Sequence, residues 1–215
     1  MEKVKEVPYG VADFVTVMEQ NLYYVDKTMF IPELEKQPRN LFFIRPRRFG
    51  KSIFLSMLHS YYDCNQSAKF QSLFGKLWIG QHPTELQGKY QVLFLDFSQV
   101  SGNIDSLERN FDFYCSVKLD GFMRRYGESY SEETREKVRK AEFAMDKLAF
   151  IHDEAAQKGF SLYLIVDEYD NFTNVVLNEH GEKVYHAITH ADGFYRDVFK
   201  KFKGNFERIF MMGVS

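Results

Sequence analysis

Four short runs of apolar residues divide the sequence, and each run is continuous rather than alternating. They cover residues 41–44, 92–97, 162–166 and 209–212. Continuous apolar runs of this length are typical of strands that are buried on both faces, as in a parallel sheet. Stretches with helical spacing lie between the runs. The sequence therefore predicts an α/β fold in which helices flank a parallel sheet.

Four main helices are expected between these strands. Residues 51–63 follow the first run, and residues 104–126 follow the second. Ser131 can cap a third helix that we expect to end at Gly159, and a last helix is expected over roughly residues 184–202. Residues 1–39 form the candidate appendage, with a helix starting near Thr28, and residues 40–215 form the core of what is otherwise a single domain.

The composition narrows the class of protein. Hydrophobic residues make up 45% of the 215 residues and the formal net charge is −2, which excludes a disordered chain and a uniformly basic surface. We therefore expect no direct nucleic-acid binding by this chain. Cys64 and Cys115 stand far apart, which argues against a zinc ribbon or a disulfide framework. With no signal-peptide core and no membrane-length apolar stretch, we expect a cytoplasmic protein.

The stretch FFIRPRRFGKSIFLSML, residues 42–58, predicts a strand, a sharp turn and a helix. Its Gly50, Lys51 and Ser52 match the end of the phosphate-binding pattern G-x-x-x-x-G-K-[ST]. Backbone N–H groups at a helix start bind anions. Lys51 would add a charge near the β- and γ-phosphates, and the Ser52 hydroxyl can ligate magnesium.

Arg45 replaces the first glycine of that pattern, and Pro46 follows it. We expect a stiffer loop that still holds phosphate, because the donors that matter run from Arg48 through Ser52. The alternative is an ordinary strand-to-helix turn with a capping glycine. Arg47 and Arg48 can each be a phosphate contact or a solvated loop residue.

Asp167 and Glu168 end the third apolar run, in the stretch LYLIVDEYD. In this position Asp167 would hold magnesium through water, and Glu168 would polarise the attacking water of an ATPase. The pair disfavours a small-molecule kinase, because nucleotide kinases often lack the second carboxylate. A strand that merely ends in an acidic turn is the alternative. The phosphate loop and the acidic strand, in this order, support each other.

Four segments in this order resemble the bacterial AAA-ATPase-like family: YYVDKTMFIPELE, FFIRPRRFGKSIFLSML, LYLIVDEYD and RIFMMGVS. The resemblance implies a P-loop NTPase fold of the additional-strand (ASCE, AAA-like) type, similar to archaeal and STAND ATPases with an R-R-x-G-K-[ST] loop. It also implies that Arg45 is typical of the family rather than a defect. Members commonly continue into a region resembling PD-(D/E)XK nucleases, so we expect the chain to be truncated after the sensor strand.

The resemblance also assigns roles to residues of the two motifs. Lys51 and Glu168 would be catalytic, and Ser52 and Asp167 would bind Mg²⁺ together with ATP. The implied nucleotide-binding residues are Arg48, Phe49, Gly50, Lys51, Ser52 and Ile53, with Tyr24, Val25 and Asp26 on the adenine side. For the last three, a docked amphipathic segment remains the alternative.

The function expected from these features is an ATP-binding module that slowly hydrolyses ATP with Mg²⁺. Its nucleotide state would act on a protein partner, an oligomer or a missing C-terminal domain. Two alternatives stay open. One is a nucleotide-binding switch or structural module without turnover, and the other is the ATPase subunit of a nuclease-associated system whose DNA work lies outside this chain.

Overall fold

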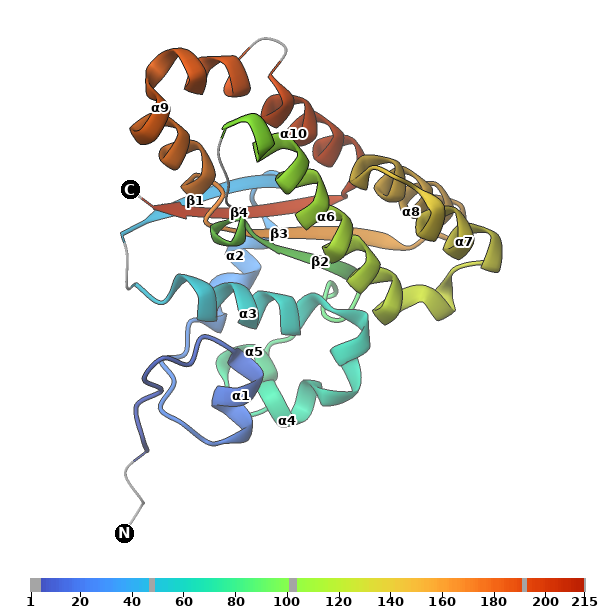
Figure 1. The fold of residues 1–215 in the computed structure, drawn as a ribbon. Helices are drawn as coiled ribbons and strands as arrows, with labels where there is room; N and C mark the ends of the chain where they lie inside the picture. Colours follow the sequence, from blue (N-terminus) through green and yellow to red (C-terminus); the bar gives the residue numbers. More distant parts are fainter. Residues whose placement is uncertain (1–4, 47–48, 101–103, 191–192, 215) are drawn as a thin grey trace. The chain divides into compact units, whose positions relative to one another are not determined.

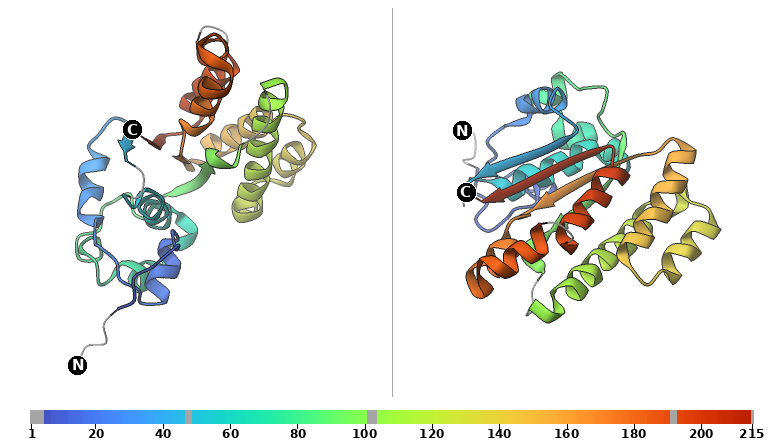
Figure 2. Two further views of the ribbon diagram at one scale, coloured as in Figure 1. Left: turned by 60° about the vertical axis from the view of Figure 1, so that its left-hand side comes forward. Right: turned by 90° about the horizontal axis from the view of Figure 1, so that it is seen from above.

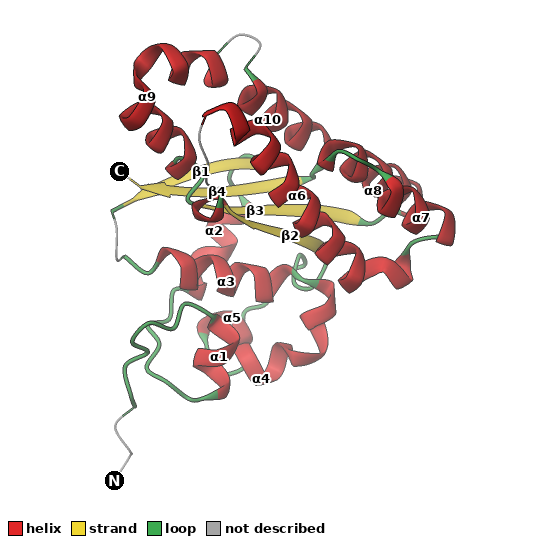
Figure 3. Cartoon of the chain, viewed as in Figure 1, coloured by secondary structure: helices red, strands yellow, loops and turns green. Residues whose placement is uncertain are grey.

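The computed structural model describes residues 5–46, 49–100, 104–190 and 193–214. The chain forms two compact units. The first unit comprises Met1–Pro38 and Pro46–Gln91, and the second comprises Arg39–Arg45 and Val92–Ser215. Figure 1 labels the helices and strands, and Figure 3 separates them by type.

A four-stranded parallel sheet forms the centre of the second unit. Its strands are β1 (Asn40–Arg45), β2 (Tyr90–Asp96), β3 (Ser161–Asp167) and β4 (Arg208–Val214), arranged in the order β1-β4-β3-β2. All four strands predicted from the apolar runs are confirmed, but the expected burial on both faces is wrong for β1, which lies at the edge of the sheet and has no buried position. β4 lies between the strand that leads into the glycine-lysine-serine loop and the strand that ends in Asp167, so the predicted additional strand is confirmed as well.

The register of the sheet brings three strand ends together. Asp167 on β3 lies level with Met212 on β4, and Met212 lies level with Phe43 on β1. In a parallel sheet the carboxyl ends of neighbouring strands meet at one edge, which is where α/β proteins place their ligands. The acidic end of β3 and the carboxyl end of β1 therefore share this edge.

Helices α6 (Ile104–Tyr126), α8 (Ala144–Lys158) and α10 (Phe194–Asn205) lie over one face of this sheet, as Figure 2 shows. Their apolar side chains pack on the strands because the strands present almost no polar atoms there. One such cluster combines Leu119 and Phe122 of α6 with Leu148 and Ile151 of α8 against Leu162 of β3. Short 3-10 segments, η3 (Phe97–Gln99) and η4 (Gly127–Ser129), connect these elements.

The single helix expected from Ser131 to Gly159 is wrong. The structure has α7 (Glu132–Lys140) and α8, separated where Ala141 adopts an extended conformation. Both starts depend on acidic side chains distant in sequence. Asp112 accepts a hydrogen bond from the backbone of Ala144 at 2.9 Å, and Glu154 accepts one from the backbone of Ser131 at 2.7 Å. The predicted caps at Ser131 and Gly159 are both present.

The single helix expected over residues 184–202 is also wrong. α9 (Asn171–Thr189) begins earlier and is interrupted at Gly181, and α10 begins only after Gly193. His190, the C-cap residue of α9, and Gly193, the N-cap residue of α10, both have an extended backbone conformation. The helix therefore ends at Thr189 instead of continuing into α10.

The first unit is a small helical assembly with an aromatic core. Its elements are α1 (Phe14–Glu19), η1 (Thr28–Phe30), α2 (Ile31–Glu35), α3 (Lys51–Tyr62), η2 (Cys64–Lys69), α4 (Phe70–Phe74) and α5 (Trp78–Gln81). The helix expected over residues 51–63 is confirmed as α3. Phe14 stacks on Phe74 at 4.9 Å between ring centroids, and both rings are fully buried. Within the described ranges, every helix is too short or too polar to cross a membrane.

Candidate functional site

The glycine-lysine-serine sequence forms the start of α3 in the first unit. Gly50 has φ +70° and ψ +32°, the left-handed conformation that favours glycine, and its carbonyl accepts the hydrogen bond from Phe54 N–H. Lys51 is the first helical residue and only 8% of it is exposed, whereas Ser52 is exposed. This loop thus turns sharply into a helix whose first N–H groups have no intrahelical partner.

The other predicted loop residues differ in how much surface they expose. Phe49 is 61% exposed and Ile53 is half-buried. Arg48, a predicted nucleotide contact, and Arg47 lie outside the described residues. Arg45 is the last residue of β1, pairs with Val214, and places its guanidinium 4.9 Å from the Phe43 ring centroid. The position that is usually glycine is therefore extended strand here, where any residue fits.

Lys27 is a residue that the sequence analysis missed. Its ammonium nitrogen lies 3.8 Å from the place where a Cβ on Gly50 would stand. Among the described residues, no carboxylate pairs with it. A cation beside the positive end of a helix is electrostatically unfavourable, so this arrangement favours an anion there. The signal available in the sequence was the lysine of the VDKT stretch.

Asp26 has a structural role in the segment expected on the adenine side. One of its carboxylate oxygens accepts from the backbone and hydroxyl of Thr28, at 2.8 and 2.7 Å, and the other accepts from the backbone of Trp78 at 2.7 Å. Tyr24 packs edge-on against Phe14, and burial raises the pKa of its hydroxyl. Val25 is 58% exposed. An adenine contact by Tyr24, Val25 or Asp26 remains a prediction.

The acidic pair lies at the carboxyl edge of the sheet in the second unit. Asp167 is 5% exposed, and its Oδ1 accepts a hydrogen bond of 2.9 Å from the backbone N–H of Glu168. Glu168 is half-buried and has φ +51°, a left-handed conformation that is rare for a residue with a side chain. Such strain costs of order 1–3 kcal/mol and tends to cluster at functional sites.

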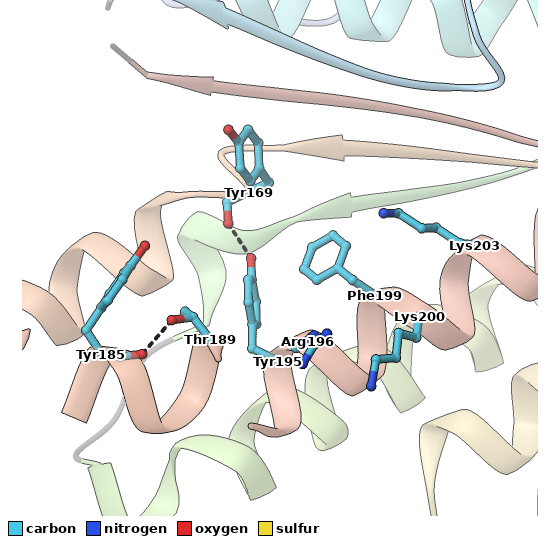
Figure 4. Close-up of a pocket in the computed structure, with 8 residues that line it drawn as sticks. All are labelled: Tyr169, Tyr185, Thr189, Tyr195, Arg196, Phe199, Lys200 and Lys203. Atoms are coloured by element: carbon cyan, nitrogen blue, oxygen red, sulfur yellow. Dashed lines mark hydrogen bonds between the residues drawn. The ribbon is translucent and has the colours of Figure 1, made fainter. Parts of the chain in front are cut away.

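Tyr169, the next residue, contacts three elements, and the sequence analysis gave it no role. Its N–H donates to the carbonyl of Met212 at 3.3 Å, and its ring lies edge-on to Phe42 with centroids 5.6 Å apart. Its carbonyl accepts a hydrogen bond from the Tyr195 hydroxyl on α10 (Figure 4). Burial raises the pKa of Tyr195 well above its ordinary value, so this hydroxyl stays protonated and donates.

Gly213 explains why the turn after Glu168 can lie so close to β4. A Cβ at Gly213 would stand 2.6 Å from Asp170 Oδ1 and 2.6 Å from Tyr169 Cε1. Real Cβ atoms do not approach other atoms so closely, so any other residue at this position would force the side chains of Asp170 and Tyr169 to shift. A glycine inside a strand pattern often marks a close approach of this kind, and that was the signal in the sequence.

Two of the predicted site residues, Ser52 and Asp167, have side chains of a kind that binds magnesium. Among the described residues, no three His, Cys, Asp or Glu side chains gather as a metal site. Magnesium bound with a nucleotide needs few protein ligands, because phosphate oxygens and water supply the rest. The Ser52 hydroxyl and the Asp167 carboxylate are each of the kind that Mg²⁺ prefers, and their binding of one ion remains a prediction.

Comparison with known proteins identifies the family. A family model described as "Predicted AAA-ATPase" matches residues 8–215, and the chain belongs to this family of AAA-ATPase-like proteins. The family supports a nucleotide-binding, ATPase-like role, and the parallel sheet with its additional strand agrees with that class.

A curated relative adds little about function. A protein of Azotobacter chroococcum mcd 1, described as "Uncharacterized protein in vnfD 5'region", is 43% identical over 63 residues. The match covers 29% of this chain and 12% of that protein's length. No solved structure matches the chain.

Proposed function

We propose that this chain binds Mg²⁺-ATP at the Gly50–Lys51–Ser52 loop and hydrolyses it slowly. The observation that carries the proposal is the start of α3, where a left-handed glycine precedes a buried lysine at the positive end of a helix. ATP is the ligand that suits this chemistry, because its phosphates satisfy the helix N–H groups and Lys51 together. Lys27 would add a second cation beside the same phosphates.

Hydrolysis would depend on the acidic pair. Ser52 and, through water, Asp167 would hold Mg²⁺, which would supply positive charge against the phosphates of ATP. The water oxygen bonds to the γ-phosphorus, the bond from that phosphorus to the β–γ bridging oxygen breaks, and ADP leaves. Glu168 orients the water and accepts its proton. Two features support this assignment, since β1 leads directly into the loop and its carboxyl end lies at the sheet edge where Asp167 ends β3.

The first test is binding, measured as the thermal stability of the full chain with ATP, with and without Mg²⁺. ATP at a hundred times its dissociation constant should stabilise the wild type by about 2.7 kcal/mol. Lys51→Ala should lose most of this gain, and Asp167→Asn should lose mainly the part that requires Mg²⁺. An equal gain in wild type and Lys51→Ala would mean that ATP binds elsewhere.

A nucleotide-binding switch without turnover is the second candidate. It shares the binding step and differs only in whether phosphate is released. We propose that in both cases the nucleotide state is passed to a protein partner or to another domain. If wild type releases no phosphate above the Lys51→Ala background while still binding ATP, the switch is the correct function and hydrolysis is wrong.

A further inference from the structure

A pocket of about 440 Å³ opens between α9 and α10 in the second unit, next to the turn that follows Glu168. Figure 4 shows its lining drawn from three segments of the chain. The lining residues are Tyr169, Tyr185, Thr189, Tyr195, Arg196, Phe199, Lys200 and Lys203. This volume lies in the range of roughly 300–1,000 Å³ that is usual for small-molecule sites. Neither the loop residues 49–53 nor Asp167 and Glu168 line it, so it is distinct from the proposed nucleotide site.

The charges of this pocket favour an anion. Its described lining contains three cations and no carboxylate. Arg196, Lys200 and Lys203 recur at four- and three-residue intervals, so they share one side of α10. Lys200 pairs with Asp197 at 2.9 Å on the exposed surface, and such a pair exchanges readily with solvent. Lys203 has no ion-pair partner among the described residues, and Figure 4 shows its ammonium directed toward Phe199.

The other residues that line the pocket favour an anionic ligand that also carries a planar ring. Tyr169, Tyr185 and Phe199 contribute aromatic surfaces, and Thr189 contributes a hydroxyl that donates to the Tyr185 carbonyl at 2.7 Å. Aromatic rings stack with nucleobases, and arginine and lysine bind phosphate. The combination of rings and cations in a space of this size matches a nucleoside monophosphate better than a bare phosphate or an apolar molecule.

The pocket is also connected to the acidic pair. The Tyr195 hydroxyl in its wall holds the carbonyl of Tyr169, whose preceding residue is the strained Glu168. Tyr195 is itself fixed by neighbouring rings, among them Phe199 at 4.7 Å between centroids. A ligand that contacts Tyr169 and Phe199 would therefore touch the residues that fix the position of the turn after Glu168.

We propose that this pocket binds a nucleoside monophosphate as a second ligand, and that its occupancy changes the rate at which Glu168 supports hydrolysis. The binding step stands by itself, whereas the effect on rate rests on the proposed ATPase function. The two parts are tested separately, so that failure of one is distinguishable from failure of the other.

Binding is tested with AMP and GMP on the full-length Lys51→Ala protein, in which the phosphate loop is disabled, by equilibrium dialysis. Replacing Lys200 and Lys203 together by alanine should weaken binding by about tenfold or more, since each lost charged contact removes a sizeable part of the affinity. Lys201→Ala is the matched control, because it removes an exposed lysine of the same helix that does not line the pocket. It should change the affinity less than about twofold.

Three outcomes would overturn the site. They are no binding of either monophosphate to the Lys51→Ala protein, equal weakening by Lys201→Ala, and inorganic phosphate binding as tightly as AMP. The last would show that the rings do not take part.

The connection is tested with Tyr195→Phe, which keeps the ring and removes the hydroxyl. We expect AMP still to bind this variant, since the Tyr195 hydroxyl is already engaged by the carbonyl of Tyr169. The change in phosphate release caused by AMP in wild type should disappear in the variant. If AMP alters the rate equally in both proteins, the connection through Tyr195 is wrong. If wild type releases no phosphate at all, the ATPase function fails and the binding result still decides the site.

Discussion

The backbone N–H of Glu168 donates a 2.9 Å hydrogen bond to the carboxylate of Asp167, the residue before it. This contact holds Glu168 in a left-handed conformation, with φ +51°. Besides its proposed role as a metal ligand, Asp167 therefore fixes the backbone that carries the proposed base. The strain is confined to Glu168. Glycine at this position would relieve the strain, but it would lack the carboxylate of the proposed base.

Replacing Glu168 should separate stability from catalysis. We expect Glu168→Gln to keep ATP bound and to slow phosphate release by about a hundredfold, because an amide cannot take the proton. Glu168→Gly should slow phosphate release by a similar factor. Its free energy of unfolding should be about 1 kcal/mol higher than that of Glu168→Gln, because glycine tolerates positive φ. Urea unfolding of the two variants measures the difference. A Gly variant that is less stable than the Gln variant would argue against strain at this position.

Lys27→Ala should have opposite effects with and without nucleotide. The free protein should gain stability by about 0.3–1 kcal/mol, because a cation leaves the positive end of α3. The affinity for ATP should fall by about fivefold or more, because a charge beside the phosphates is lost. Calorimetric titration and thermal unfolding measure both. Lys36→Ala is the control, since it only breaks an exposed pair with Glu33. An unchanged ATP affinity in Lys27→Ala would remove Lys27 from the site.

Arg45→Gly restores the usual loop pattern and should still bring no gain in binding. Arg45 belongs to β1 and stacks on Phe43, so glycine should lower stability by about 1 kcal/mol through the lost stacking and the more flexible backbone. We expect the ATP dissociation constant to stay within a few-fold of wild type in a direct titration. A large change in either direction would show that Arg45 contacts the nucleotide.

The sheet could be predicted from the sequence because its strands carry a local signal. Strands that are buried on both faces must be continuously apolar, and β3, with six buried positions of seven, is the clearest case. The family resemblance implied only an additional strand between the two motif strands, and the full order β1-β4-β3-β2 came from the structure. Apolar runs show that strands exist, but they do not show which strands are neighbours.

The helix boundaries failed where the decisive contact is distant in sequence. The start of α8 is capped by Asp112 from α6, 32 residues away, and no local pattern contains that information. The break before α10 did have a local signal, since Gly193 precedes it. The helical spacing of the flanking residues outweighed that glycine in the sequence analysis.

The candidate site likewise contains residues that the sequence predicts and residues that it does not. Gly50, Lys51, Asp167 and Glu168 could be named because their roles depend on short motifs next to strands. Lys27 lies beside Gly50 only through the fold of the first unit, and the hydrogen bond from Tyr195 to Tyr169 joins residues 26 positions apart. Contacts of this kind are decided by packing, so the structure was needed to find them.

Acid should weaken the contact between Ser131, at the start of α7, and Glu154 of α8. Burial would raise the pKa of Glu154, but hydrogen bonds from Lys158, Thr134 and Ser131 outweigh it and lower the pKa from 4.5 to about 2. A lowered folded-state pKa means that this stabilisation is present above about pH 4.5 and is lost as the pH falls toward 2. Glu154→Gln should therefore cost about 1–3 kcal/mol at pH 7 and progressively less in acid. Denaturant unfolding across this range tests it, and a cost independent of pH would contradict the assignment.

Gly213→Ala tests whether the close packing at the sheet edge controls the turn that carries Glu168. The added methyl group would stand 2.6 Å from Tyr169 Cε1, so the ring must move away from its place against Phe42. We expect a loss of about 1–3 kcal/mol in the free energy of unfolding, as for other overpacked sites. Phosphate release should slow more than ATP binding weakens, because Tyr169 adjoins Glu168 and not the phosphate loop.

A double-mutant cycle gives the decisive measurement for this contact. In a Tyr169→Ala background the ring is absent, so adding Gly213→Ala should cost less stability than it does in wild type, with part of the cost remaining from Asp170. Equal costs in the two backgrounds would mean that the ring does not resist the methyl group. The requirement for glycine in β4 would then come from Asp170 alone, and the packing of Tyr169 on β4 would no longer explain how the turn is held.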